Sequence, residues 1–337
     1  MFRPISVCGS VREEGWSVIC AVVKTMSRMK NQSLSRRVVL SQGFAGVAAI
    51  LAHAFPISAL ASDRPFFART GLPIGLQLYT LGEIVDSDLD GALTKVARIG
   101  FNTIELAGFR IDQPARIRAA ADRVGLKIRS VHLGAEASDG YLGLGDEPGQ
   151  LAASIHTLGA AVVVLPGPLS RNSDDKPPRA TLEDWKRTAA FLNGRGAALR
   201  REGLLLAYHN HNPEFAPVEG TTGFDVLMRE TDRKLVTFEM DAGWARAAGK
   251  DPVELLNRYA GRFRLMHVKD ISASTRVNFE YSMDSTEVGH GIIDWPRVIA
   301  AAYNTGVTQY FVEQEPPFKK DRFASIADSF AYLSSMP

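Results

Sequence analysis

From about residue 72 onward, the apolar positions of this chain alternate between two spacings. Short apolar runs rich in β-branched residues predict strands, and longer stretches with apolar residues three or four positions apart predict amphipathic helices. The expected strands cover 74–80, 102–107, 128–133, 161–166, 204–209, 236–241, 263–268 and 309–314. The expected helices cover 88–99, 114–124, 149–158, 182–201, 223–229, 252–259, 295–305 and 322–333.

This alternation predicts an α/β fold with a parallel sheet. Eight strand–helix repeats over about 265 residues match a closed (β/α)8 TIM barrel better than an open sheet. No linker or low-complexity run divides the region, so we expect one domain over 62–337. Gly125, Gly203 and Gly261 stand where helices should end, as left-handed caps often do. The loops 167–180 and 271–291 follow strands, and we expect them to act as mobile lids.

Chemically active residues collect at the carboxyl ends of the expected strands. Since side chains alternate along a strand, His267 and Lys269 share a face, as do Glu313 and Glu315. Four of the six histidines after residue 61 lie at strand ends. The full strand-end set is Gln77, Tyr79, Glu105, His132, His209, His211, Glu239, Asp241, His267, Lys269, Glu313 and Glu315. In a barrel these ends converge on the active site.

Imidazole and carboxylate groups in one pocket favour a divalent ion such as Mn²⁺, Zn²⁺ or Mg²⁺. We expect one ion bound by Asp241, His267 and Glu313, with His209 as the fourth ligand. His211 competes with His209 for the fourth position. A lone strand-end histidine such as His132 is as often a hydrogen-bonded structural group as a functional one. Glu239 lies one layer deeper in the barrel, which favours a buried, hydrogen-bonded role.

Residues 1–61 have the features of an export signal. A twin-arginine pair at 35–40 (SRRVVL) precedes an apolar stretch over 43–55 and a small-x-small site at 59–61 (ALA). This pattern predicts a cleaved twin-arginine signal peptide and a periplasmic mature protein. The alternative is an uncleaved N-terminal anchor, although the apolar stretch is short for the roughly 20 residues that a membrane span needs.

Removing this segment changes the charge and the cysteine content. The whole chain has 39 Lys and Arg, 37 Asp and Glu, and a net charge of +2. Residues 1–61 hold seven of the basic and two of the acidic residues, which leaves 32 basic, 35 acidic and a net charge of −3. A negative domain makes nucleic acid an improbable partner. Both cysteines, Cys8 and Cys20, also leave, which excludes disulfides and Cys-ligated zinc from the mature chain.

Five motifs give the chain a resemblance to a known family. They are 208–211 (YHNH), 241–243 (DAG), 267–270 (HVKD), 289–294 (GHGIID) and 312–315 (VEQE). In them the chain resembles the xylose-isomerase-like superfamily of sugar phosphate isomerases and epimerases, and most of all its inosose dehydratase branch. The resemblance implies a metal-dependent barrel whose ligands fall on Asp241, His267 and Glu313.

Two positions depart from the pattern of that family. Epimerases of this fold carry a glutamate at the end of strand 5, where this chain has His209. The pair of opposed glutamates that exchange a proton on the two faces of a sugar is therefore missing. The family also tends to have a histidine three residues after the strand-6 aspartate, where this chain has Trp244. An indole can stack on a sugar ring, but it cannot ligate a metal or transfer a proton.

These residues predict a metal-dependent isomerase or epimerase acting on a sugar or keto-sugar. The reaction would remove a proton next to a carbonyl, and the ion would stabilise the enediolate. We expect Glu313 to be the base, Lys269 to hold a substrate oxygen, and His211 or His132 to return the proton. The residues expected to contact the sugar are Gln77, Glu105, Trp244 and Glu315.

Other functions remain open at this point. Proton removal followed by loss of a β-oxygen would make the chain a lyase of the same fold, either an inosose-type dehydratase or a 3-keto-glycoside eliminase. A periplasmic sugar-binding protein that lost the reaction is a second alternative. An apurinic-site endonuclease would need a basic groove, which the net charge opposes. The sugar, the ion and the oligomeric state stay undetermined.

Overall fold

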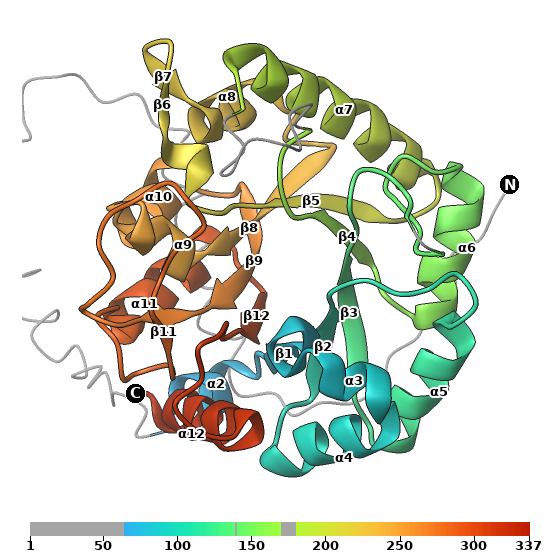
Figure 1. Ribbon diagram of the computed structural model, residues 1–337, viewed down its shortest axis with the longest axis vertical. Helices are drawn as coiled ribbons and strands as arrows, with labels where there is room; N and C mark the ends of the chain where they lie inside the picture. The colour runs from blue at the N-terminus through green and yellow to red at the C-terminus, as the bar shows by residue number, and fades with distance from the viewer. Residues whose placement is uncertain (1–63, 139, 170–179) are drawn as a thin grey trace, which may run out of the picture. The chain divides into compact units, whose positions relative to one another are not determined.

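The computed structural model describes residues 64–138, 140–169 and 180–337 (Figure 1). The expected signal peptide and most of the loop 167–180 lie outside the described residues. Among the described residues, no helix is long and apolar enough to cross a membrane.

Eight parallel strands form a closed barrel, and helices surround it (Figure 1). The strand order around the barrel is β1-β12-β9-β8-β5-β4-β3-β2. The strands are β1 (Ile74–Gln77), β2 (Thr103–Leu106), β3 (Lys127–His132), β4 (Val162–Leu165), β5 (Leu205–His209), β8 (Val236–Asp241), β9 (Phe263–Val268) and β12 (Gln309–Val312). The (β/α)8 barrel expected from the sequence is confirmed.

The eight expected helices are all present. The helices are α2 (Phe66–Thr70), α3 (Glu83–Ser87), α4 (Leu89–Ile99), α5 (Pro114–Arg123), α6 (Pro148–Leu158), α7 (Leu182–Arg201), α8 (Gly223–Glu230), α9 (Ala242–Ala247), α10 (Pro252–Arg258), α11 (Trp295–Thr305) and α12 (Arg322–Ser335). A capping box between Thr181 and Asp184 begins α7. Gly125, Gly203 and Gly261 follow helices with φ of 76°, 77° and 78°, as expected.

The boundaries differ from expectation by more than one residue at two strands. The first strand ends at Gln77, and residues 78–80 belong to the 3-10 helix η3 (Leu78–Leu81) because the Gln77 side chain accepts a hydrogen bond from the Tyr79 backbone. The last strand ends at Val312, so Glu313 and Glu315 lie beyond it.

Several short elements were not expected. Helix α9 begins directly after β8 because Asp241 caps it. The others are the short helices α2 and α3, η4 (Pro213–Phe215), the hairpin β6 (Pro217–Val218) with β7 (Thr221–Thr222), and the hairpin β10 (Asp270–Ile271) with β11 (Ser285–Thr286).

The lower barrel interior is apolar and supports the polar layer above it. Its buried cluster consists of Val162, Val164, Ala207, Leu265 and Phe311. Phe311 packs over the bare backbone of Gly75, where an added Cβ would lie only 2.5 Å from the aromatic ring. Since side chains on one face repeat every second residue, His267 and Glu313 follow Leu265 and Phe311 toward the mouth.

Candidate active site

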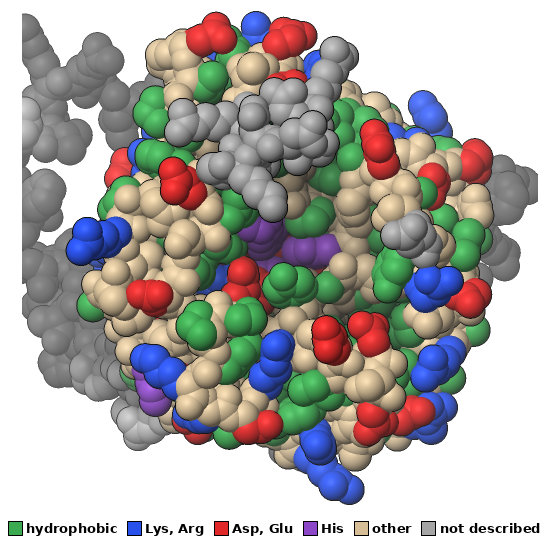
Figure 2. All heavy atoms as spheres, viewed as in Figure 1, with side chains coloured by type: hydrophobic (Ala, Val, Ile, Leu, Met, Phe, Trp, Pro, Cys, Tyr) green, Lys and Arg blue, Asp and Glu red, His purple; other side chains and the backbone are tan. Residues whose placement is uncertain are grey.

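The four expected metal ligands converge at the carboxyl ends of β5, β8, β9 and β12. Asp241, His267 and Glu313 each offer a ligand atom within 4.8 Å of the others. Nδ1 of His267 lies 2.8 Å from Oε2 of Glu313 and 3.7 Å from Oδ2 of Asp241. Nε2 of His209 lies 3.8 Å from the same Asp241 oxygen. Figure 2 shows histidine and acidic side chains together in the hollow at the centre of this face.

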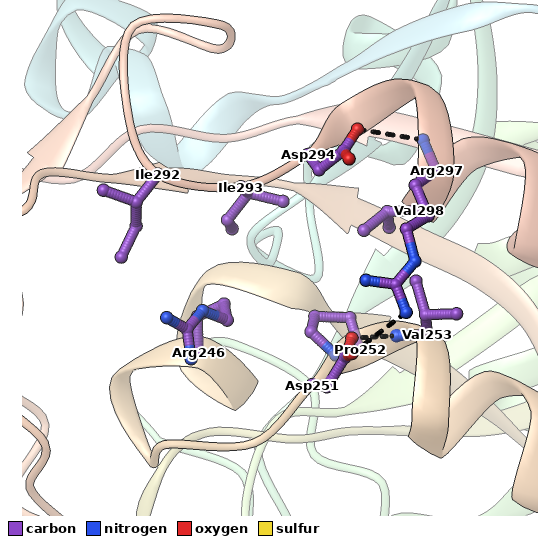
Figure 3. A pocket seen from close by; sticks show the side chains of 9 residues that line it. All are labelled: Arg246, Asp251, Pro252, Val253, Ile292, Ile293, Asp294, Arg297 and Val298. Atoms are coloured by element: carbon purple, nitrogen blue, oxygen red, sulfur yellow. Dashed lines mark hydrogen bonds and ion pairs between the residues drawn. The ribbon is translucent and has the colours of Figure 1, made fainter.

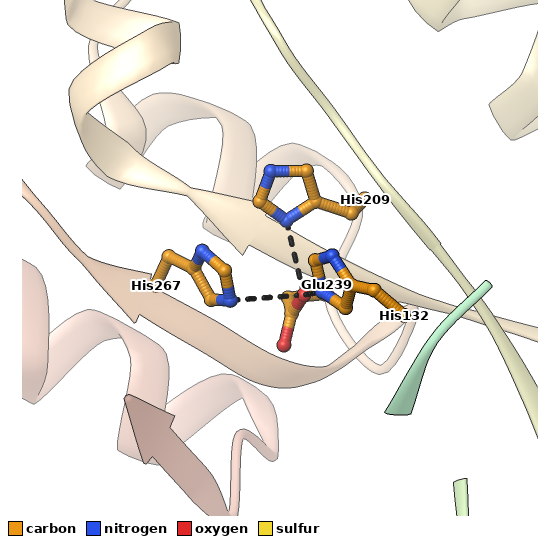
Figure 4. A group of neighbouring side chains, drawn as sticks. All are labelled: His132, His209, Glu239 and His267. Atoms are coloured by element: carbon orange, nitrogen blue, oxygen red, sulfur yellow. Dashed lines mark hydrogen bonds and ion pairs between the residues drawn. The ribbon is translucent and has the colours of Figure 1, made fainter. Parts of the chain in front are cut away.

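The other ring nitrogen of each histidine contacts a buried carboxylate. Nε2 of His267 lies 2.7 Å from Oε1 of Glu105. Nδ1 of His209 lies 3.0 Å from Oε2 of Glu239 (Figure 4). Metal-ligating histidines in proteins almost always donate their second N–H in this way, which fixes the ring and the tautomer. Nδ1 of His267 and Nε2 of His209 are therefore the nitrogens that would face a bound ion.

Asp241 supplies the acceptor between these two nitrogens. Its Oδ1 accepts the Trp244 backbone N–H at 2.8 Å and so caps α9. Its Oδ2 is buried and accepts no hydrogen bond from the described residues, and its nearest cation is Nζ of Lys269 at 3.0 Å. A buried carboxylate oxygen without a hydrogen bond is costly unless a cation compensates for it. Lys269 supplies part of this compensation. The imidazole and carboxylate donors grouped around the same oxygen are of the kinds that a divalent ion takes as ligands, so the donor set fits such an ion.

A second group of potential ligands lies deeper in the barrel. It consists of His132, His209, Glu239 and His267 (Figure 4). Oε2 of Glu239 lies 2.9 Å from Nε2 of His132 and 3.2 Å from Nε2 of His267, which are hydrogen-bond distances. His132 also contacts Oε1 of Glu105 at 3.0 Å. We interpret this group as the hydrogen-bonding layer that orients the two metal-directed histidines.

Two residues expected to contact the sugar belong to this same buried layer. Glu105 accepts a hydrogen bond from Gln77 at 2.8 Å and another from Ser130. Both Gln77 and Glu105 are fully buried. This position suits them for holding His267, and a direct contact between them and a sugar stays a prediction. His132, expected to be a proton donor, is occupied between two carboxylates.

Lys269 lies at the mouth among carboxylates. Its Nζ is 2.7 Å from Glu313 and 2.5 Å from Glu315. Burial alone would lower the pKa of Lys269, but Asp241 and Glu313 outweigh burial and raise it well above the usual range. The ammonium is a fixed positive charge that can bind a substrate oxygen.

Glu313 is ionised at neutral pH. Burial would raise its pKa, but Lys269 and His267 outweigh burial and hold the pKa below the usual range. The site also contains the carboxyl groups of Glu105, Glu239, Asp241 and Glu315. Three groups oppose these five carboxyl groups: the Lys269 ammonium, and His132 and His267, whose pKa values neighbouring carboxylates raise against the effect of burial. The acidic groups still outnumber the cationic ones, which favours a bound cation.

The histidines differ in protonation. Burial and the neighbouring His267 lower the pKa of His209, so its imidazole is neutral, as a ligand must be. Burial opposes a charge on His132, yet Glu105 and Glu239 raise its pKa to about 9. Burial and Lys269 lower the pKa of His211 to about 3. A neutral His211 can form hydrogen bonds with a substrate, but it holds no extra proton to donate.

Three aromatic rings form one side of the mouth, and we call them the aromatic wall: His211, Trp244 and Tyr281. The ring centroids of His211 and Trp244 are 5.5 Å apart, and those of His211 and Tyr281 are 5.2 Å apart. Trp244 is buried, with Nζ of Lys269 5.0 Å from its ring, whereas Tyr281 is 38% exposed.

The cavities formed by the described residues include two that lie outside this centre. One of about 230 Å³ lies beside α9 and α10, where Asp251 contacts Arg297 (Figure 3), and none of the expected site residues lines it. A larger cavity of about 560 Å³ is lined partly by Leu78 and Leu106, which directly follow Gln77 and Glu105.

The sequence expectations omitted Ser130 and Tyr281 from the site. Ser130 lies two positions before His132 on β3, so strand alternation could have identified it. Tyr281 lies in a long loop, where no periodicity predicts which side chains face the site.

Comparison with known proteins places these observations in a family. The family model described as xylose isomerase-like TIM barrel matches residues 93–336. An inosose dehydratase of Lacticaseibacillus casei is 26% identical over 200 residues, which cover 54% of this chain and 66% of the relative. The match thus spans just under two thirds of that relative's length.

Solved structures agree on the fold. A sugar phosphate isomerase/epimerase from Parabacteroides distasonis is 27% identical, has a TM-score of 0.65, and the match covers 79% of this chain and 95% of that one. A xylose isomerase-like TIM barrel protein from Mycobacterium smegmatis in complex with magnesium has a TM-score of 0.59 at 15% identity and covers 79% of this chain and 96% of that one. This chain belongs to the xylose isomerase-like TIM barrel family.

Proposed function

We propose that this chain is a metal-dependent enzyme that removes the proton next to the carbonyl of a keto-sugar and then expels the β-oxygen. This is lyase chemistry. The observation that carries it is the histidine His209 at the end of β5, where, by the resemblance, epimerases of this fold have the second glutamate that they need for proton exchange on both faces of a sugar. Its Nδ1 is occupied by Glu239 at 3.0 Å. The inosose dehydratase relative supports the same reaction class.

One divalent ion would be held by His209, Asp241, His267 and Glu313. When bound, it would polarise the substrate carbonyl and so acidify the neighbouring C–H. Asp241 and the two histidines fit this role because the carboxylates behind them fix the ring nitrogens that face the ion.

Three side chains of the site have separate roles in proton transfer and in binding the substrate. Glu313 accepts the carbon-bound proton, since it is ionised and, with 6% exposure, lies at the mouth, whereas Asp241 is fully buried. A positioned base of this kind contributes about 10²–10⁴-fold to the rate. The Lys269 ammonium, 2.7 Å from Glu313, donates a hydrogen bond to the oxygen that gains negative charge. Glu313 then gives that proton to the departing β-oxygen, so the C–O bond breaks, a C=C bond forms, and the oxygen leaves as water or an alcohol. Neutral His211 hydrogen-bonds a sugar hydroxyl.

The proposal is tested by incubating metal-loaded protein in D₂O with a panel of 3-keto-glycosides, inososes and ketohexoses. NMR follows two events, exchange of the C–H next to the carbonyl and loss of water or of an alcohol from the β-carbon. Both events with one panel member support the lyase. No exchange with any keto-sugar contradicts the proposal, and tight binding without chemical change would indicate a sugar-binding protein.

Isomerisation or epimerisation is the second candidate, and the Parabacteroides distasonis relative supports it. In this case the proton returns to carbon, and His211 or His132 would have to deliver it. Exchange with deuterium and a rearranged sugar, without loss of oxygen, would distinguish this outcome.

We also propose export through the twin-arginine route, on the strength of the pair at 36–37. Fusing residues 1–61 to a fluorescent reporter tests it. Periplasmic fluorescence that is lost when both arginines become lysines supports the proposal, and cytoplasmic fluorescence from the unchanged fusion contradicts it.

A further inference from the structure

The aromatic wall lies directly against the proposed metal ligands. His211 follows His209 by two residues, and the two rings have centroids 4.8 Å apart. Trp244 is attached to Asp241 through the 2.8 Å cap hydrogen bond. A substrate held by the ion would therefore contact this wall with the rest of its molecule.

Two polar atoms of the wall lack partners. Nδ1 of His211 and Nε1 of Trp244 are buried, and neither forms a hydrogen bond with a described residue. Trp244 is only 2% exposed. A buried indole N–H without an acceptor is costly, so its presence beside a mouth indicates an acceptor on a ligand.

Tyr281 completes the wall from a different part of the chain. It lies in the loop between β10 and β11, and its φ is 52°, a left-handed conformation that residues with a Cβ rarely adopt. Such strain persists only where surrounding contacts enforce it, and it clusters at functional sites.

Asn212 supplies those contacts. Its side chain is fully buried next to His211. Its Nδ2 donates to the backbone carbonyl of Asn278 at 3.0 Å and to Oδ1 of the same residue at 2.7 Å. Its Oδ1 accepts the backbone N–H of Tyr281 at 3.0 Å. One side chain therefore fastens the loop that carries Tyr281 to the end of β5.

We propose that His211, Trp244 and Tyr281 form a ring-binding subsite that selects six-membered-ring substrates over open-chain ones, with Asn212 as the residue that positions Tyr281. This inference rests on the proposed function. A closed pyranose or cyclitol presents a rigid face of C–H groups that packs on an accessible ring such as that of Tyr281, which is 38% exposed, and its hydroxyls can meet the two unpartnered ring nitrogens. An acyclic sugar presents no such face, and binding it would cost more conformational entropy.

Calorimetry with metal-loaded protein and two probes tests the subsite. Methyl 3-keto-α-D-glucopyranoside has a ring that cannot open, and dihydroxyacetone offers a keto and a hydroxyl oxygen without any ring. Tyr281→Ala is expected to weaken binding of the glycoside about tenfold and to leave dihydroxyacetone unchanged. Tyr281→Phe, which keeps the ring, is expected to retain wild-type affinity for both probes.

Asn212→Ala tests the positioning role. It is expected to weaken binding of the glycoside as much as Tyr281→Ala does. The double variant should bind the glycoside about as weakly as either single variant, since both changes remove the same contact of the Tyr281 ring with the substrate. Equal losses for both probes, or no loss for the glycoside, would overturn the subsite, as would wild-type protein that binds dihydroxyacetone but not the glycoside. Because the readout is the affinity for each probe and not the formation of product, the subsite can hold even if the proposed elimination fails.

Discussion

Nε2 of His267 lies 2.7 Å from Oε1 of Glu105, and this contact determines which ring nitrogen faces the candidate metal site. Glu105 is itself held by Gln77 and Ser130. The contact ties β9 to β2 across the barrel interior and leaves Nδ1 of His267 directed at Asp241 and Glu313.

Replacing the buried carboxylate should therefore weaken metal binding. We expect Glu105→Gln to reduce the affinity for the ion about 10–100-fold, because an amide no longer raises the basicity of the His267 ring. Titration of metal-free protein measures this affinity. Asp90→Asn, at an exposed position on α4, is the matched control and should bind like wild type. An unchanged affinity in Glu105→Gln would show that the contact does not support the ligand.

Glu313 should be essential for turnover. We expect Glu313→Gln to retain the fold and to lose about 10²–10⁴-fold in kcat, because the amide cannot accept a proton. Glu315→Gln is the matched control, since its carboxylate also contacts Lys269 but lies further out, and it should lose far less. Metal content is measured on both variants so that loss of the ion is separated from loss of the base. Comparable turnover in Glu313→Gln and wild type would refute the assignment.

Glu214 should make stability depend on pH. Burial raises the pKa of Glu214 to about 7, although the hydrogen bond from Tyr208 opposes the shift. A raised pKa means that its contribution to stability is fully present below about pH 4.5 and is lost as the pH rises through about 7.

We therefore expect the free energy of unfolding of wild type to fall by up to about 3 kcal/mol between about pH 5 and pH 8, relative to that of Glu214→Gln. Urea denaturation of both proteins across this range measures the difference. Parallel stability curves for the two proteins would count against a raised pKa.

Asp270 should be a stability residue rather than a catalytic one. Its carboxylate is fully buried and accepts hydrogen bonds from the backbones of Ile271, Gly289, Gly291 and Ile293 and from Nε1 of Trp295. We expect Asp270→Asn to destabilise the protein by about 2–4 kcal/mol, because an amide cannot accept all of these hydrogen bonds and places an N–H against N–H donors. Denaturation midpoints test this, with Asp294→Asn at the exposed cap of α11 for comparison.

The sequence was sufficient for the barrel and for the convergence of its strand ends. Period-two spacing placed His267 above Leu265 and Glu313 above Phe311, and in a closed parallel barrel such positions must meet. The same spacing predicted a buried, hydrogen-bonded role for Glu239, and the contact of Glu239 with Nδ1 of His209 agrees with that prediction.

What spacing could not predict were contacts that depend on tertiary structure. Strand alternation cannot show that Gln77 and Glu105 bond to each other and orient a histidine rather than reach the mouth. It also cannot place Tyr281, because the position of this residue depends on a hydrogen bond from its backbone N–H to the side chain of Asn212, which lies in another loop. The spacing also did not predict that the last strand ends at Val312, since Glu313 continues the alternation and its backbone N–H still donates to Val268 of β9.

The most direct test of the account is anomalous scattering from crystals of the purified protein, combined with elemental analysis of the same sample. We expect one divalent ion per chain, ligated by His209, Asp241, His267 and Glu313, and activity that is lost on chelation and restored when the ion returns. Full activity in a sample verified to be free of metal would contradict the account, as would an ion bound only by the deeper group around Glu239.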